Sequence, residues 1–224
     1  MGDMSVKRAT NERQKEARRD AILHAARSLF MEAGFFDVSM ATIAKRAGLA
    51  KGTVYLYFKT KEEIFLALST EEITVWLDRV DMSLTEHQPG MPIDHFVSVI
   101  LETLDDRQVM LRLITLLHLV LEKNISYEEA FAFKMYLKTR SEQTAQLIER
   151  ALPFLTPGQG LEVLSTLHCL VVGLGQMSDP SPVLAKVLEH PELAPFRVDL
   201  KQNLLTIFSH ILNGMKNSLD QAKP

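Results

Sequence analysis

The 224-residue sequence contains a single cysteine, Cys169, which excludes a disulfide bond within one chain. A lone thiol is typical of a reducing compartment, and its apolar neighbours, Leu167 and residues 170–172, predict that it is buried. Glycine and proline are too scarce for a low-complexity or collagen-like chain. The chain is therefore expected to fold around an ordinary hydrophobic core, without disulfide bonds.

Long hydrophobic runs are also missing. The longest apolar stretch, residues 161–174, is interrupted by Ser165, Thr166 and His168 and is shorter than the roughly 20 residues that cross a bilayer. The first twenty residues are polar and mixed in charge, without the apolar core of a secretory signal. We therefore expect a cytoplasmic protein with no membrane partner, in which residues 161–174 form a buried helix.

The sequence lacks the arrangements that catalysis or metal binding requires. No nucleophile with its base, phosphate-binding loop or metal-ligand spacing is present. The carboxylate pairs Glu128–Glu129 and Asp105–Asp106 are adjacent residues, which point in different directions on a helix, and the seven histidines are scattered. The chain is thus predicted not to be an enzyme, and no metal or cofactor is expected.

Sustained alternation of apolar and polar residues, the pattern of strands, is absent as well. Apolar residues instead recur at helical spacing, which predicts an all-α protein. A first helix should follow the stripe from Ile22 to Ala33 and stop at Gly34; a second should be capped by Ser39 and end at Gly48; a third should begin near Lys51.

Seven further helices are expected beyond the third one. A Thr60–Glu63 capping box should start a long helix that ends before residue 87. The others are predicted at about residues 92–104, 107–122, 126–152, 160–177, 182–188 and 196–218, separated by Gly and Pro. Residues 160–177 and 196–218 are too apolar to face water on all sides.

Charge is distributed unevenly along the chain. Residues 1–61 contain twelve Lys and Arg against six Asp and Glu, net +6, whereas the remainder contains thirteen against twenty-two, net −9. The basic segment is the candidate for contact with phosphate. Its N-terminal cations either reach a neighbouring groove of a nucleic acid or are simply solvated: Lys7, Arg8, Arg13, Lys15, Arg18 and Arg19.

Residues 39–58 fit a helix-turn-helix, in which the second short helix enters the major groove of duplex DNA. In the third predicted helix Val54 and Phe58 lie one turn apart on the inner face. Gly52, Thr53, Tyr55 and Leu56 then point outward. The alternative is that Tyr55, Tyr57 and Phe58 are ordinary core aromatics, which the agreement of pattern and charge disfavours.

Residues 21–68, AILHAARSLFMEAGFFDVSMATIAKRAGLAKGTVYLYFKTKEEIFLAL, resemble the N-terminal domain of the tetracycline-repressor (TetR) family of bacterial regulators. The most specific matches are Gly34-Phe35, Ile43-Ala44, Ala47-Gly48 and residues 52–58, followed by Lys59, Lys61 and Glu62-Glu63. The resemblance implies a transcriptional regulator, most often a repressor.

The DNA-binding residues predicted from pattern and resemblance are Ser39, Thr42, Lys51, Gly52, Thr53, Tyr55, Leu56, Tyr57, Lys59 and Lys61. Lys51 and Lys61 should pair with phosphates, and Tyr57 matches a family position that touches the DNA backbone. The chain departs from the family at two positions. Leu56 stands where relatives often have a polar or aromatic residue, and Ala41 stands where they often have a polar one. The base preference of relatives therefore does not transfer.

The resemblance divides the chain into an N-terminal arm and DNA-binding domain, residues 1–65, and a helical effector-binding and dimerisation domain, residues 66–224. It implies a homodimer on palindromic operator DNA, released by a small, largely apolar effector. The predicted dimer residues are Leu167, Leu170, Leu174, Leu204, Phe208 and Ile211. The predicted pocket residues are Trp76, Phe96, Met110, His118, Phe131, Met135 and His168. An alternative is that this domain binds a protein partner or no effector, and activation instead of repression stays open.

Overall fold

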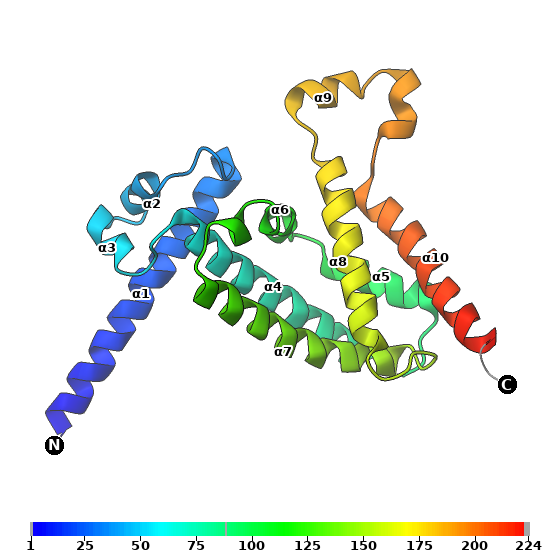
Figure 1. The fold of residues 1–224 in the computed structure, drawn as a ribbon, viewed down its shortest axis with the longest axis horizontal. Coiled ribbons are helices and arrows are strands. Elements are labelled where there is room, and N and C mark those ends of the chain that lie inside the picture. The colour runs from blue at the N-terminus through cyan, green and yellow to red at the C-terminus, as the bar shows by residue number, and fades with distance from the viewer. Residues whose placement is uncertain (1, 88, 222–224) are drawn as a thin grey trace. The chain divides into compact units, whose positions relative to one another are not determined.

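The computed structural model describes residues 2–87 and 89–221, and its regular elements are all helical (Figure 1). The side chains of residues 2–10, 219 and 220 also lie outside the description, including those of Lys7 and Arg8 in the predicted basic arm. Two compact units form: Met1–Glu71 with Leu117–Ala130, and Glu72–Leu116 with Phe131–Pro224. We call them the first unit and the second unit, in that order. The predicted all-α class is confirmed.

The first unit contains α1 (Gly2–Ala33), α2 (Met40–Arg46), α3 (Lys51–Tyr55), the start of α4 (Lys61–Glu86), the short 3-10 helix η1 (Leu121–Lys123) and the first residues of α7 (Tyr127–Ala151). A cluster of aromatic rings lies at its centre. The Phe65 ring of α4 lies 5.5 Å from that of Phe30 and 5.1 Å from that of Phe35, centroid to centroid. Burial of these large rings stabilises the arrangement of α1 and α4 on which α2 and α3 pack.

The second unit holds the rest of α4 and α7 together with α5 (Ile93–Thr103), α6 (Gln108–Leu117), α8 (Gln159–Ser178), α9 (Pro182–Val187), the 3-10 helix η2 (Pro191–Phe196) and α10 (Leu200–Gln221). The predicted helix at 107–122 is too long, because α6 ends at Leu117 and η1 follows. The predicted start at residue 196 is too early. Asp199 accepts from the Gln202 amide and so begins α10 at Leu200.

One stripe of α8 and one of α10 are buried in the core of the second unit. On α8 the stripe includes Val163, Leu167 and Val171. On α10 it is Leu204, Phe208 and Leu212, and the Phe208 ring lies 6.4 Å from that of Phe96 on α5. Three of the predicted dimer residues, Leu167, Leu204 and Phe208, are therefore buried within the protomer, and their place at a dimer interface stays a prediction.

Cys169 is exposed, and the prediction of a buried thiol is wrong. The residue lies on the face of α8 opposite Leu167, together with exposed Gly173 and Met177. Within the described residues, α8 is the one helix long and apolar enough to cross a membrane by length and composition, yet only 28% of that stretch is buried. The buried core helix of a soluble protein also has this length and composition.

The N-terminus of α8 crosses α7 at very short range. A Cβ atom built on Gly160 would lie 2.2 Å from the backbone oxygen of Ala145, closer than any real contact. The Glu149 carboxylate, also from α7, accepts from the amides of Gly158 and Gly160 at 2.7 and 3.0 Å. An acidic side chain at a helix N-terminus is favourable, so α7 both caps and positions α8.

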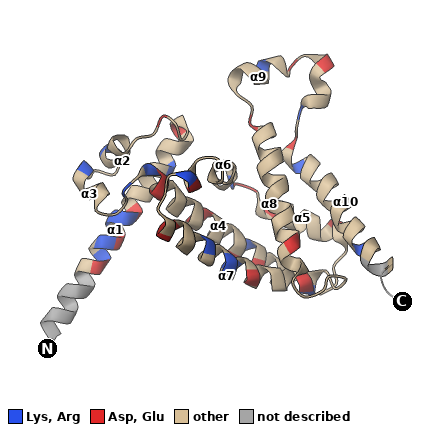
Figure 2. Cartoon of the chain, in the orientation of Figure 1, with Lys and Arg blue, Asp and Glu red and all other residues tan. Residues whose placement is uncertain are grey.

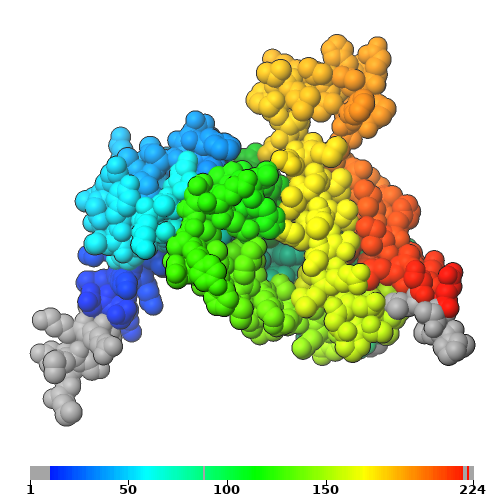
Figure 3. Space-filling view, viewed as in Figure 1, coloured from blue at the N-terminus to red at the C-terminus, as the bar shows by residue number. Residues whose placement is uncertain are grey.

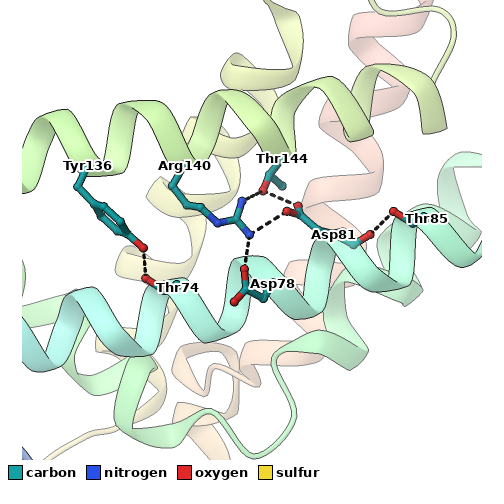
Figure 4. Close-up of polar contacts among 7 residues, drawn as sticks. All are labelled: Thr74, Asp78, Asp81, Thr85, Tyr136, Arg140 and Thr144. Atoms are coloured by element: carbon teal, nitrogen blue, oxygen red, sulfur yellow. Dashed lines mark hydrogen bonds and ion pairs between the residues drawn. The ribbon is translucent and has the colours of Figure 1, made fainter. Parts of the chain in front are cut away.

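Polar contacts join α4 to α7 in the second unit (Figure 4). Nη2 of Arg140 lies 2.7 Å from Asp78 and 2.8 Å from Asp81, and the Thr144 hydroxyl donates to Asp81 at 2.6 Å. Burial lowers the pKa of Arg140, but the hydrogen bond to Asp78 and the charge of Asp81 raise it, and the net shift is upward. Arg140 thus stays charged between the two helices.

Candidate nucleic-acid interface

A reciprocal pair of hydrogen bonds fixes the start of α2. The Ser39 hydroxyl accepts from the Thr42 amide at 3.2 Å, and the Thr42 hydroxyl accepts from the Ser39 amide at 2.9 Å. This is a capping box, which satisfies two backbone donors that a helix start leaves open. Both side chains stay exposed and carry hydroxyls at the surface beside that helix start. The capping role predicted for Ser39 is confirmed.

A glycine forms the tight turn between α2 and α3. Gly48 has a φ of +68°, a left-handed conformation that side chains disfavour, and the Leu49 amide donates back to the Ala44 carbonyl at 3.0 Å. Val54 on α3 is completely buried, and Phe58, three residues beyond the end of the helix, is nearly so, as predicted. Tyr55 and Leu56 point outward and are 45% and 83% exposed. The end of α3 and the residue that follows it therefore present one aromatic and one aliphatic side chain to solvent.

The start of α4 departs in detail from the predicted capping box. The Glu63 amide donates to the Thr60 hydroxyl at 3.1 Å, as expected. The Glu63 carboxylate accepts from the amide of Lys59, one residue before the expected Thr60, at 2.6 Å. The chain after α3 is thus tied to α4 at Lys59. The side chain of Lys59 is exposed, and the backbone from which it extends is held in place.

The Lys61 side chain points into the first unit instead of towards solvent. Its Nζ donates to the carbonyl oxygens of Phe35 and Val38, both at 3.0 Å, and lies 4.2 Å from the centroid of the Phe35 ring. These contacts hold the loop between α1 and α2 against the start of α4. Two of the three ammonium hydrogens are used, so at most one is left for a phosphate. Lys61 is a positioning residue.

We predict that Lys61→Met lowers the free energy of unfolding by about 1 kcal/mol, because it removes hydrogen bonds from a charged donor while keeping most of the stem. Urea denaturation monitored by circular dichroism measures this. Lys59→Met is the matched control, since the Lys59 side chain is exposed, and it should leave stability unchanged. Equal midpoints for wild type and Lys61→Met would contradict the assigned role.

A second ion pair ties α2 to α1 and was not anticipated from sequence. Arg46 donates to both carboxylate oxygens of Glu32, at 2.8 and 2.7 Å, and to the Ser28 hydroxyl at 2.8 Å. The hydrogen bond from Arg46 lowers the pKa of Glu32 from its ordinary 4.5 to about 2. The fourteen-residue separation falls outside the helical i to i+4 spacing, so no local pattern marks the pair.

The stability that Glu32 contributes should depend on pH. Because its pKa is lower in the folded protein, the contribution is complete above about pH 4.5 and is lost as pH falls towards 2. Glu32→Gln is expected to lower the thermal midpoint at pH 7 and to approach wild type at pH 3. Glu12→Gln, at an exposed position of α1, is the control. A difference from wild type that is the same at both pH values would refute the assignment.

Exposed cations surround the outward face of α3. Lys45 on α2, Lys51 at the start of α3 and Lys59 after it all have exposed side chains. In Figure 2 the cations of the described part of α1 alternate with acidic residues along that helix. Lys45 was not among the predicted contacts, although its place on α2 beside Ala44 gave it an outward direction.

The residues predicted to line an effector pocket do not form one wall. Trp76, Phe96 and Met110 lie in the core of the second unit, and the Trp76 indole donates to Thr103 at 3.0 Å. Phe131 and Met135 are 55% and 45% exposed. His168 is half-buried on α8, and His118 contacts Glu122 at 3.2 Å in the first unit. Their role in ligand binding stays a prediction.

Two pockets of the second unit are lined by other residues. One of about 390 Å³ lies between the end of α8 and the segment before α10, bordered by Met177, Leu188 and Arg197. The other, about 160 Å³, lies between α4 and α7 near Leu84 and Leu147. Across the described residues, no three His, Cys, Asp or Glu side chains come together as a metal site.

The chain matches two family models. Residues 22–68 match the bacterial regulatory proteins of the tetR family, and residues 70–218 match a tetracyclin repressor-like C-terminal domain. Among curated relatives, the Fatty acid metabolism regulator protein of Bacillus subtilis is 36% identical over 74 residues, 33% of this chain and 38% of the relative. The regulator RutR of Escherichia coli is 29% identical over 94 residues, 42% of this chain and 44% of the relative. The chain thus spans less than half the length of these relatives.

Solved structures share the fold at low identity. The fatty acid degradation regulator FadR of Bacillus halodurans has a TM-score of 0.52 at 18% identity, over 85% of this chain and 97% of that one. A transcriptional regulator from Rhodococcus has a TM-score of 0.56 at 20% identity, over 88% and 96%. The two family models together cover residues 22–68 and 70–218, so this chain belongs to the tetR family of bacterial transcriptional regulators.

Proposed function

We propose that the chain is a dimeric regulator that acts as a repressor and reads a palindromic operator with the outer face of α3. The observation that carries the proposal is the exposure of Tyr55 and Leu56 on a helix whose inner face is buried, beside exposed Lys51 and Lys59. The lysines supply phosphate contacts that set position, whereas Tyr55 and Leu56 supply base contacts. Leu56 favours a thymine methyl, since it offers no hydrogen bond.

Binding to randomised duplex DNA, with sequencing of the retained fraction at two salt concentrations, tests this reading. A palindrome with half-sites about 34 Å apart is expected, because a two-fold dimer places two recognition helices one duplex turn apart. Higher salt should weaken binding to all fragments, since phosphate contacts release counterions. Retention without any sequence preference would contradict operator recognition.

The outer faces of α8 and α10 support dimerisation. Of the predicted interface residues, Leu170, Leu174 and Ile211 are only half-buried within the protomer, and the first two follow exposed Cys169 and Gly173 directly along α8. α8 and α10 run beside each other in the second unit (Figure 1). A helix this apolar and this little buried is suited to a four-helix interface with a second copy.

The interface can be tested at Gly173, where an added Cβ would meet no atom within 4 Å. Gly173→Arg is expected to fold normally and to shift the protein towards monomer in sedimentation velocity, because it places a large cation in an apolar interface. Gly173→Ala is the matched control and should keep the wild-type distribution. A Gly173→Arg protein that stays dimeric at micromolar concentration would exclude this face.

The proposed effector is a small, largely apolar molecule. Two of the similar proteins are regulators of fatty acid metabolism in B. subtilis and of fatty acid degradation in B. halodurans. A fatty-acyl compound is therefore the first class to test. Palmitoyl-CoA should lower operator affinity in fluorescence anisotropy, whereas coenzyme A alone should not. Equal affinity with and without palmitoyl-CoA would exclude this effector class and favour a protein partner as the signal. The expected compartment of such a regulator is the cytoplasm.

A further inference from the structure

The smaller pocket of the second unit, about 160 Å³, lies between the last turn of α4 and the last turns of α7, and we call it the cleft. In Figure 3 the end of α7 is drawn in yellow-green at the lower edge of the second unit, where α8 begins. Apolar and polar side chains line the cleft together: Leu84, Leu147 and Ala151, with Thr85, His87 and Arg150. None of them belongs to the proposed DNA-reading face or dimer face, so the cleft has no part in either.

Hydrogen bonds at both ends hold the walls of the cleft in place. Beyond the turn that follows α4, the Met91 amide donates to the Ala151 carbonyl at 3.0 Å and so ties this turn to the end of α7. The His87 ring is tied to α4, because its Nδ1 lies 2.7 Å from the Ser83 carbonyl oxygen. The cleft is therefore preformed, and a ligand loses little free energy in ordering it.

The contact of His87 decides which hydrogen bond its ring can make with a ligand. A carbonyl oxygen only accepts, so the hydrogen lies on Nδ1 and the neutral ring keeps a lone pair on Nε2. The Thr85 hydroxyl is also committed as a donor, to the Asp81 carbonyl at 2.7 Å (Figure 4). In the cleft, both groups can therefore accept a hydrogen bond from a ligand, and neither has a hydrogen left to donate.

Arg150 supplies donors and a positive charge. Its side chain is exposed, and among the residues that the structure describes no group forms an ion pair or hydrogen bond with it. The described lining of the cleft includes no acidic side chain that could pair with the guanidinium. A guanidinium is always charged and binds a planar carboxylate through two parallel N–H donors. The Arg150 guanidinium is therefore available to the carboxylate of a ligand.

We propose that the cleft binds a short hydroxy acid, a ligand separate from the fatty-acyl effector proposed above. Its carboxylate pairs with Arg150, its hydroxyl donates to Nε2 of His87, and its alkyl carbons lie against Leu84 and Leu147. A water molecule takes about 30 Å³ in the liquid, so a volume of about 160 Å³ holds about five groups of that size. This room suits a chain of about four carbons and excludes a long acyl chain.

The lining favours such a ligand over a simple anion. Leu84 is buried and Leu147 is half-buried, so an inorganic anion would lose water there without gaining an apolar contact. A carboxylic acid without a hydroxyl would leave the acceptors of Thr85 and His87 without a hydrogen from the ligand. A molecule with a carboxylate, a hydroxyl and a short alkyl chain matches the cation, the acceptors and the apolar wall together.

Saturation-transfer difference NMR on the full-length protein, with β-hydroxybutyrate as the probe, measures binding in the absence of DNA. β-Hydroxybutyrate is expected to bind about fivefold more tightly than butyrate, which has the same carbons without the hydroxyl, because one hydrogen bond contributes about that much. Inorganic phosphate at the same concentration should not displace it. Absence of binding, equal affinity for the two acids, or displacement by phosphate overturns the proposal. Because no DNA or acyl-CoA is present, the outcome is independent of operator recognition and of the fatty-acyl effector.

Two variants place the bound probe in the cleft. Arg150→Gln should weaken binding of both acids about tenfold, because it removes a charge-assisted pair. His87→Phe keeps a flat ring and removes the acceptor, so it should bind β-hydroxybutyrate only as tightly as butyrate. Arg13→Gln, at an exposed position of α1, is the matched control and should bind as wild type does. Circular dichroism should show an unchanged helical fold for all three variants. Wild-type affinity for β-hydroxybutyrate in folded Arg150→Gln or His87→Phe overturns the proposal.

Discussion

Replacing Gly160 by alanine is expected to lower the free energy of unfolding by about 3 kcal/mol. The added methyl group would lie 2.2 Å from the Ala145 oxygen and 2.8 Å from its carbonyl carbon. These are backbone atoms, which cannot rotate away as a flexible side chain would. Overfilling a packed site costs typically 1–3 kcal/mol, and the rigidity of the neighbour puts this substitution at the upper end.

Urea unfolding of Gly160→Ala beside Gly173→Ala measures the effect. Both glycines lie on α8, and alanine is the better helix former at either position. Gly173 has no atom within 4 Å of its added Cβ, so its variant reports helix propensity alone. If the two variants were equally stable, α7 and α8 could move apart at little cost in free energy. The close crossing at Ala145 would then not contribute to stability as predicted.

The second large effect is expected on DNA affinity. Tyr55→Ala should weaken binding to the selected operator about tenfold to a hundredfold, because a side chain in contact with bases contributes about 1–3 kcal/mol. Stability should stay near wild type, since Tyr55 is 45% exposed and Val54 carries the packing of α3. Fluorescence anisotropy with the operator and with a scrambled duplex measures the change.

Tyr55→Phe separates the two parts of this contact. If the hydroxyl carries it, the phenylalanine variant should bind as weakly as the alanine variant; if the ring carries it, affinity should be retained. The loss for Tyr55→Ala should be larger on the operator than on scrambled DNA, because base contacts are specific and phosphate contacts are not. Full operator affinity in Tyr55→Ala would remove α3 from the interface.

Features set by neighbouring residues could be predicted from sequence. Ser39 as a cap, Gly48 as a turn and the inward direction of Val54 depend on residues within one or two helical turns, where spacing determines geometry. The end of α4 before residue 87 was also predicted, because Pro89 and Gly90 follow it. Resemblance then gave the family, since its specific motif lies within these local elements.

Features that depend on contacts between distant residues could not be predicted from the sequence. Lys61 and the Phe35 carbonyl are 26 residues apart, and their contact depends on how α4 meets the loop before α2. On α8 apolar residues occupy more than one face, so periodicity could not show that Leu167 faces inward and Cys169 outward; the packing against α7 and α10 decides this. An apolar helix in the sequence indicates burial in an assembly as well as burial in a single chain.

The contacts of Arg140 pair one cation of α7 with two acidic side chains of α4. Asp78 and Asp81 are three residues apart, about 4.5 Å along the helix axis, and one guanidinium contacts both. If one carboxylate is lost, the other still pairs with the cation, so the buried charge is not left without a partner. Because α4 begins in the first unit and continues into the second, this redundancy protects the helix that connects the two units.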